Sequence, residues 1–170
     1  MKKKVFLSLG SNIGDKRNNL EKGKQLLIEN SNVNLVRTSP IYKTEPMYNK
    51  NQESYLNQVI EVRTILNPSE LLGLIKVIEL RMGRKISNNK NMPRPMDIDI
   101  LTVDNIIMDT PGLKLPHPHL QERKFVLEPW SNIAPDYTVP KLDKTVTELL
   151  SDVKDELATT ILSSEESIIA

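Results

Sequence analysis

Apolar residues recur with two spacings along the first hundred residues, and segments of the two kinds alternate. An apolar residue at about every second position is typical of strands, whereas a stripe that recurs every three or four positions is typical of helices. The predicted strands are VFLSLG from Val5, Val33–Lys43, Tyr55–Leu66 and PRPMDIDIL from Pro93, and the predicted helices are Asp15–Ile28 and Pro68–Met82. This β-α-β-β-α-β order predicts an α+β domain in which helices cover an antiparallel sheet.

Local signals support two of these boundaries. Asn67 suits the N-cap of the second helix, Pro68 its first position, and Glu70 completes the spacing of a capping box. Pro40 interrupts the second β-rich segment, and because proline lacks an N–H group it must lie at an edge or a bulge.

The patterns weaken after residue 101. Ile106–Met108 is predicted to form a short strand, Gln121–Trp130 either a short helix or an extended run, and Val146–Leu157 a helix. The last dozen residues are expected to be disordered. We predict one domain over residues 1–160, followed by a flexible tail at 161–170.

The amino-acid composition argues against several classes of protein. The chain has 170 residues, a formal net charge of +1, 4% aromatic residues and no cysteine. Without cysteine there is no disulfide or thiolate metal site, and a cytoplasmic location is permitted. No apolar run approaches membrane length, and the low charge with few aromatic residues argues against a nucleic-acid surface. Composition thus leaves small-molecule ligands as the expected partners. We also expect the protein to be cytoplasmic, and monomeric or at most weakly dimeric.

The segment PRPMDIDIL places two acidic residues inside an apolar strand. Residues two apart share one face of a strand, so Asp97 and Asp99 project together, roughly 7 Å apart by strand geometry. They would repel unless a cation lies between them, and such oxygen ligands suit Mg²⁺ shared with substrate phosphates. The alternative is a half-exposed strand with solvated acids. Arg94 ends the basic segment Arg84–Arg94, RKISNNKNMPR, whose positive charges favour a phosphate site.

A second candidate cluster is LPHPHLQERKF, residues 115–125. It reads either as a stiff surface turn or as a site in which His117 donates to a phosphate. A zinc site is disfavoured because the chain has only two histidines and no cysteine. A P-loop is absent, since Gly23-Lys24 lacks the required glycine and Ser/Thr neighbours, and GSNIG alone indicates only a turn.

Taken together, the motifs resemble those of the 6-hydroxymethyl-7,8-dihydropterin pyrophosphokinase family over about residues 4–140. The matching segments occur in the family's order: GSNIGD, SPIYKTEP, YLN, IELRMGR, PRPMDIDIL and LPHPHLQERKFVLEP. The resemblance implies a ferredoxin-like α+β fold. It also implies transfer of the β,γ-pyrophosphoryl group of ATP to the pterin hydroxymethyl group in folate biosynthesis, with release of AMP.

The same resemblance implies roles for the charged residues. Asp97 and Asp99 would hold two Mg²⁺ ions that bridge the ATP phosphates. Arg84 and Arg94 match arginines of the family's mobile catalytic loop, and together with the two acids they form the expected catalytic set. The implied ATP-binding residues are Glu79, Arg84, Arg94, Ile100, Lys114, His117 and Arg123.

For the pterin, the resemblance implies a sandwich between the rings of Tyr55 and Phe125, with a hydrogen bond from Asn57. The backbone over Thr44, Glu45 and Met47 would line the edge of the pterin. Read without the resemblance, the two aromatic residues could equally belong to the core, and Asn57 could be an ordinary polar strand residue.

The basic segment departs from the family pattern. Asn91-Met92 replaces the usual tryptophan-glycine, and Ile86 replaces a second basic residue. Since such loops exclude water and complete a site, we expect the same reaction with altered loop closure and weaker substrate retention. Two alternatives are a non-catalytic module that binds RNA or a nucleotide, and another small-molecule kinase that releases ADP.

Overall fold

The structure, a computed structural model, describes residues 1–45, 51, 53–84, 93–154 and 159–162. Its main sheet is antiparallel, with the strand order β10-β3-β4-β1-β5 and with β2 also paired to β4. Two small hairpins, β6-β7 and β8-β9, lie outside this sheet. The sheet strands are β1 (Lys3–Ser11), β2 (Val33–Thr38), β3 (Tyr42–Thr44), β4 (Tyr55–Thr64), β5 (Asp97–Val103) and β10 (Thr159–Ile161).

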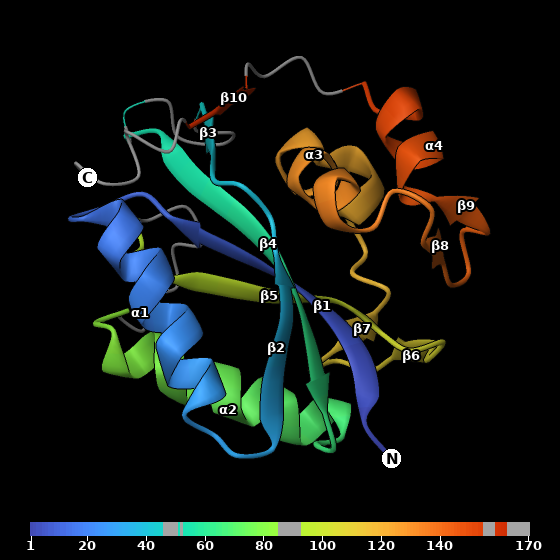
Figure 1. Ribbon diagram of the computed structural model, residues 1–170, viewed down its shortest axis with the longest axis horizontal. Helices are drawn as coiled ribbons and strands as arrows, with labels where there is room; N and C mark the ends of the chain where they lie inside the picture. Colours follow the sequence, from blue (N-terminus) through green and yellow to red (C-terminus); the bar gives the residue numbers. More distant parts are fainter. Residues whose placement is uncertain (46–50, 52, 85–92, 155–158, 163–170) are drawn as a thin grey trace.

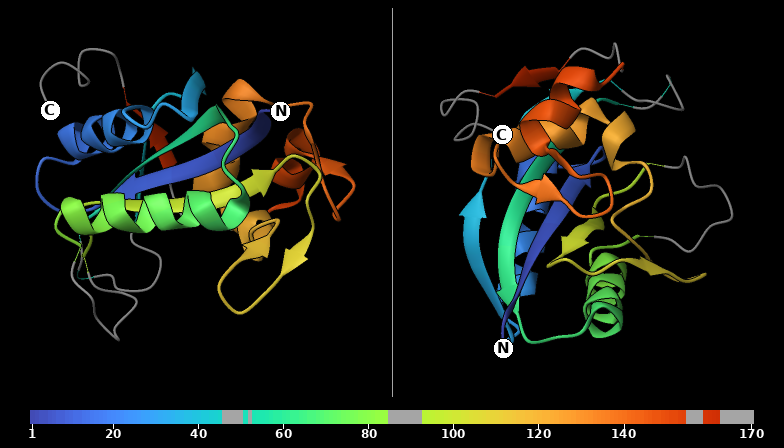
Figure 2. Two further views of the ribbon diagram at one scale, coloured as in Figure 1. Left: turned by 90° about the horizontal axis from the view of Figure 1, so that it is seen from below. Right: turned by 90° about the vertical axis from the view of Figure 1, so that its right-hand side faces the viewer.

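Helices cover both faces of the sheet (Figures 1 and 2). On one face, α1 (Lys16–Ile28) and α2 (Pro68–Arg81) enclose a core that includes Leu27 and Ile75. On the other face, α3 (Lys124–Ile133) and α4 (Val146–Asp152) pack around Trp130. The alternating pattern of β4 explains the two cores, because Leu56, Ile60 and Val62 enter the first and Val59 enters the second.

Both helix starts predicted from the sequence are confirmed. Asp15 is the N-cap of α1, and its carboxylate accepts a hydrogen bond from the Asn18 N–H. The capping box of α2 is complete, with Asn67 and Glu70 each bonded to the other's backbone. The β-rich segment Val33–Lys43 is divided into β2 and β3 on either side of Pro40, as the missing N–H requires. The α+β fold is therefore the one predicted.

Several predictions after residue 101 are wrong in their bounds. The expected strand Ile106–Met108 is instead the short strand β6 (Met108–Asp109), paired with β7 (Lys114–Leu115). The chain turns first, because Asp104 has φ 46° and the Ile106 N–H donates to the Val103 carbonyl. Of the two readings for Gln121–Trp130, the helical one is confirmed: a 3₁₀ turn, η1 (Leu120–Glu122), leads into α3.

The C-terminal region also differs from expectation. Helix α4 ends at Asp152, not Leu157, because Val153 adopts extended dihedral angles. It follows the hairpin of β8 (Thr138–Val139) and β9 (Lys144–Thr145). The segment Thr159–Ile161, expected to be disordered, forms β10 on the open edge of β3. Residues 163–170 of the predicted tail lie outside the described residues.

Candidate active site

The acid pair lies where the strand pattern places it. Asp97 and Asp99 are on one face of β5, opposite Gly10 and Ser8 of β1. The apolar residues that alternate with them are buried among α1 and α2: Met96, Ile98 and Ile100. Both acids are partly exposed, so packing does not require them at these positions.

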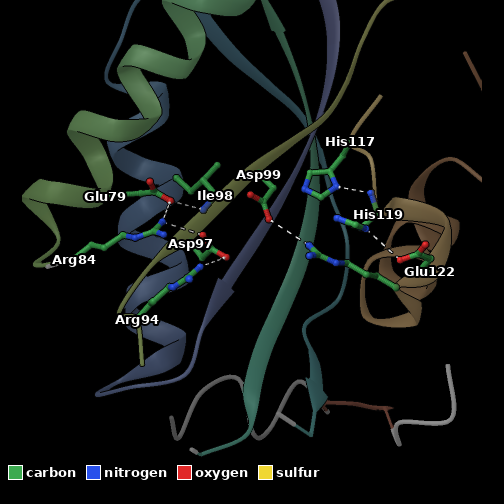
Figure 3. A network of polar contacts seen from close by, with 10 residues as sticks. Glu79, Arg84, Arg94, Asp97, Ile98, Asp99, His117, His119 and Glu122 are labelled. Atoms are coloured by element: carbon green, nitrogen blue, oxygen red, sulfur yellow. Dashed lines mark hydrogen bonds and ion pairs between the residues drawn. The ribbon is translucent and has the colours of Figure 1, made fainter. Parts of the chain in front are cut away.

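Two arginines contact Asp97 (Figure 3). Arg84 Nη1 lies 3.1 Å from Asp97 Oδ1, and Arg94 Nη1 lies 3.3 Å from Asp97 Oδ2. The three side chains are between 18% and 26% exposed, which means that solvent screens these ion pairs only in part. Arg84 and Arg94 therefore converge on Asp97 as the sequence indicates. Residues 85–92, with Ile86 and Asn91-Met92, lie outside the described residues.

Glu79 links the end of α2 to this cluster. Its side chain is 2% exposed, and its Oε2 accepts hydrogen bonds from Arg84 Nη1 at 2.8 Å and from the Ile98 N–H at 2.9 Å. Burial raises the pKa of Glu79, while the Ile98 hydrogen bond and the Arg84 charge act in the opposite direction. Arg84 thus bridges two carboxylates, one from the helix and one from the strand.

Asp99 lies in a more negative environment than Asp97. Its pKa is raised to about 7, first by burial and then by the negative charge of Asp97, against the positive charge of Arg123. Arg123 Nη1 is 3.9 Å from Asp99 Oδ2, too far for a hydrogen bond. The guanidinium of Arg123 also lies over the Phe125 ring, 5.8 Å from its centroid. Asp99 therefore has a single, more distant arginine beside it, whereas Asp97 forms ion pairs with two.

His117 presents one defined ring nitrogen as a donor. Its Nδ1 accepts a hydrogen bond from the His119 N–H at 3.1 Å, so the ring proton resides on Nε2. Burial, followed by the positive charge of Arg123, lowers the pKa of His117 to about 4. His117 is thus a neutral donor at physiological pH, and Figure 3 shows it on the side of the cluster beyond Asp99.

This lowered pKa predicts a pH-dependent stability. Between pH 6.5 and about 4 the unfolded state binds a proton at His117 that the folded state does not, so stability falls as the pH falls through this window. The unfolding free energy of the unmutated protein, relative to His117→Gln, is expected to drop by about 2–3 kcal/mol over this range. Denaturant unfolding of both proteins at several pH values measures this difference, and a constant difference would contradict the assignment.

The candidate pterin residues gather on β3 and β4. Asn57 Nδ2 donates to Thr44 Oγ1 at 2.7 Å, and both side chains are buried. Tyr55, opposite Thr44 in the ladder, is partly buried, and its pKa is raised by burial and by the nearby Asp97 charge. Tyr55 therefore lies close enough to Asp97 to feel its charge.

The remaining candidates are placed less closely. Phe125 is in the first turn of α3, a helix that packs on β3 and β4, and Glu45 is exposed just after β3. Ile100 is 4% exposed in the core, and Lys114 is exposed on β7 and paired with Asp109. Met47 lies outside the described residues. The structure therefore does not bring the side chains of Ile100 and Lys114 to the acid pair.

Gly10 separates the two halves of the site. It pairs with Asn57 on one side and with Asp97 on the other. A Cβ atom at this position would lie 3.2 Å from Asn57 Oδ1 and 3.6 Å from the Tyr55 ring. The first distance is tighter than ordinary packing, so a side chain here would displace Asn57.

Gly10→Ala is expected to weaken pterin binding by about tenfold, which corresponds to the loss of one well-placed hydrogen bond. Titration of the pterin by calorimetry measures the effect. Gly73→Ala is the matched control, because a Cβ there meets nothing within 4 Å and Gly73 lies in the exposed part of α2. An unchanged pterin affinity in Gly10→Ala would show that Asn57 does not face the pterin.

Sequence reasoning missed the contribution of the β1–α1 turn. Asn12 is 1% exposed and hydrogen-bonded to the backbone of Arg94, and Gly10 leaves the space described above. The available signal was GSNIG, which predicts a turn but not its partners.

The fold and the site together define a class of protein: an α+β domain whose edge strand carries an acid pair framed by arginines, suited to polyanionic ligands. The family model described as 7,8-dihydro-6-hydroxymethylpterin-pyrophosphokinase (HPPK) matches residues 6–135. The chain belongs to this family.

Curated relatives agree with this assignment. The 2-amino-4-hydroxy-6-hydroxymethyldihydropteridine pyrophosphokinase of Bacillus subtilis is 39% identical over 129 residues, which cover 76% of this chain and 77% of that protein. The Pseudomonas aeruginosa protein of the same name is 35% identical and covers 82% and 86%. The folic acid synthesis protein fol1 of Schizosaccharomyces pombe is 36% identical over 89% of this chain, but the chain spans only 21% of that protein.

Solved structures show the same fold. The crystal structure of wild-type HPPK-DHPS from Plasmodium falciparum superposes with a TM-score of 0.68 at 18% identity, covering 89% of this chain and 44% of that one. At this identity the likeness concerns the fold alone. Within the part of the chain that the structure describes, no helix is both long and apolar enough to cross a membrane.

Proposed function

We propose that the protein transfers the pyrophosphoryl group of ATP to 6-hydroxymethyl-7,8-dihydropterin in folate biosynthesis. The hydroxymethyl oxygen would form a bond to the β-phosphorus, the bond from the β-phosphorus to the oxygen shared with the α-phosphorus would break, and AMP would leave as the hydroxyl proton is released. The observation that carries the proposal is the acid pair Asp97/Asp99 among Arg84, Arg94 and Arg123, in a member of this family.

The residues fit the two Mg²⁺ ions that the resemblance implies. Carboxylate oxygens are the ligands that Mg²⁺ prefers, and it commonly takes one or two of them together with substrate phosphates. Burial, followed by the negative charge of Asp97, raises the pKa of Asp99 against the effect of Arg123, so a cation bound at the pair would relieve the repulsion between the two acids. Asp97 and Asp99 would hold the metal, and bound Mg²⁺ would neutralise charge on the phosphate oxygens.

The arginines and His117 would act on the phosphates. Arg84 and Arg94 each form an ion pair with Asp97, and a guanidinium can bind phosphate oxygens through paired N–H groups. Nε2–H of His117 and the Arg123 guanidinium would contact the same polyanion from beyond Asp99. Since phosphoryl-type transfer depends mainly on positioning and electrostatics, these contacts account for most of the expected catalysis.

Tyr55 and Asn57 would orient the pterin. Their position on β4, one strand removed from β5 across β1, supports this role, since a pterin bound there would lie beside the acid pair. The main chain of Ile100 is the part of that residue left for a contact with ATP, because its side chain is in the core. The contacts of Lys114, Glu45 and Phe125 with substrates, a monomeric state and a cytoplasmic location stay predictions.

Nucleotide product analysis tests the proposal. The purified protein is incubated with ATP, Mg²⁺ and the pterin, and the nucleotides are separated by chromatography, with parallel reactions that lack the pterin or contain EDTA. AMP formation that requires both the pterin and the metal is expected. ADP as the product would indicate an ordinary kinase, and nucleotide binding without turnover would indicate a binding module.

A further inference from the structure

The β1–α1 turn is hydrogen-bonded to Arg94, three residues before the first acid of the pair. The Asn12 N–H donates to the Arg94 carbonyl at 3.1 Å, and Asn12 Oδ1 accepts from the Arg94 N–H at 2.7 Å. These two residues are 82 positions apart, and the regular β1–β5 ladder ends at Gly10 and Asp97. Asn12 thus extends the pairing past the end of the ladder by using its side chain for one of the two bonds.

The sequence around Arg94 makes this contact important. Arg94 lies between Pro93 and Pro95, and neither proline has an N–H group. The N–H of Arg94 is therefore the single main-chain donor of this tripeptide, and Asn12 is its partner. Removing that acceptor would leave a partly buried donor without its bond, and Arg94 would lose its main-chain anchor.

Asn12 is itself held firmly. Asn12 is 1% exposed, and the preceding Ser11 is fully buried. Asn19 of α1 donates through Nδ2 to the Ile13 carbonyl and to Ser11 Oγ, and Gly14 adopts φ +73°, a backbone conformation that side chains disfavour. The turn is thus fixed to the first helix as well as to β1.

We propose that Asn12 is a positioning residue for pyrophosphoryl transfer, acting through Arg94. The main chain of Arg94 is fixed by Asn12, and its guanidinium reaches Asp97 at 3.3 Å, so the arginine is held at both ends. This rests on the proposed function, because it assigns Arg94 to the phosphates. Holding the guanidinium in place before the substrate arrives lowers the cost of organising the transition state.

The first test compares variants by steady-state kinetics. Asn12→Leu removes the acceptor at similar volume, whereas Asn12→Asp keeps an oxygen in its place. Asn12→Leu is expected to lower kcat by about 10- to 100-fold with KM changed less than about threefold, and Asn12→Asp is expected to recover part of the loss. Thr145→Ala, which removes the N-cap of α4, is the control for reduced stability without a contact to Arg94.

Coupling to Arg94 separates positioning from a general loss of structure. Adding Asn12→Leu to an Arg94→Ala protein is expected to lower kcat no further than about twofold, because the residue through which Asn12 acts is already gone. Fully multiplicative losses would overturn the proposal, as would an unchanged kcat in a folded Asn12→Leu protein. Asn12→Ala provides the same comparison if the leucine variant does not fold.

Hydrogen exchange of the unmutated protein tests the contact without any assay of activity. The Arg94 amide, followed by NMR, is expected to exchange at least about tenfold more slowly than a freely solvated amide. An unprotected Arg94 amide would overturn the proposal even if AMP is formed. A protected amide together with no AMP would instead contradict the proposed function and leave the anchor intact.

Discussion

Asp97→Asn and Asp99→Asn are each expected to lower the rate of AMP formation at least about 10³-fold while the protein stays folded. Each change removes one negative charge from the pair that would hold Mg²⁺, with almost no change in shape. Neither side chain fills the core, since both acids are partly exposed whereas the neighbouring Ile98 and Ile100 are buried in it.

The stability of the Asp99 variant distinguishes a metal site from a structural ion pair. Because the pKa of Asp99 is raised from 3.8 to about 7, the folded state holds a proton at Asp99 that the unfolded state releases. This proton binding stabilises the fold at low pH, and the stabilisation is lost as the pH rises through about 7. At pH 8 without metal, Asp99→Asn should therefore be at least as stable as the unmutated protein. Thermal unfolding with and without Mg²⁺ measures this, and the metal should stabilise only the unmutated protein. A large loss of stability without metal would mean that Asp99 serves the fold.

The main elements could be predicted because their signals are local. The capping box at Asn67 and Glu70 and the alternation of β4 involve neighbouring residues, and the structure confirms both. The acid pair was equally visible, since a strand's period of two fixes which residues share a face. Where a signal depends only on nearby residues, the sequence was sufficient.

Contacts between distant segments were not predictable. Nothing near Thr159 indicates that this segment pairs with β3, because an open strand edge accepts many sequences. The bridge from Glu79 through Arg84 to Asp97 joins α2 to β5, and the bond from Asn12 joins a turn to residue 94. Such hydrogen bonds leave no periodic trace in the sequence. They are nevertheless what fixes the arginines relative to the acids.

Arg94→Ala is expected to slow the chemical step and Tyr55→Ala to weaken pterin binding. This contrast would assign Arg94 to the phosphates and Tyr55 to the pterin. Arg94→Ala should lower kcat by about 10²- to 10³-fold with pterin affinity nearly unchanged, because the guanidinium acts on charge at the phosphates. Tyr55→Ala should weaken pterin binding by about 10- to 100-fold, the usual contribution of stacking on an aromatic side chain.

Single-turnover rates and pterin dissociation constants, measured for both variants, separate chemistry from binding. Tyr55→Phe is the control: it keeps the ring and removes only the hydroxyl, so it should bind the pterin almost as the unmutated protein does. If Arg94→Ala instead lost pterin affinity, Arg94 would belong to the pterin pocket. If Tyr55→Ala kept its affinity, the ring would serve the core, where its partial burial beside Asp97 would then be a feature of packing alone.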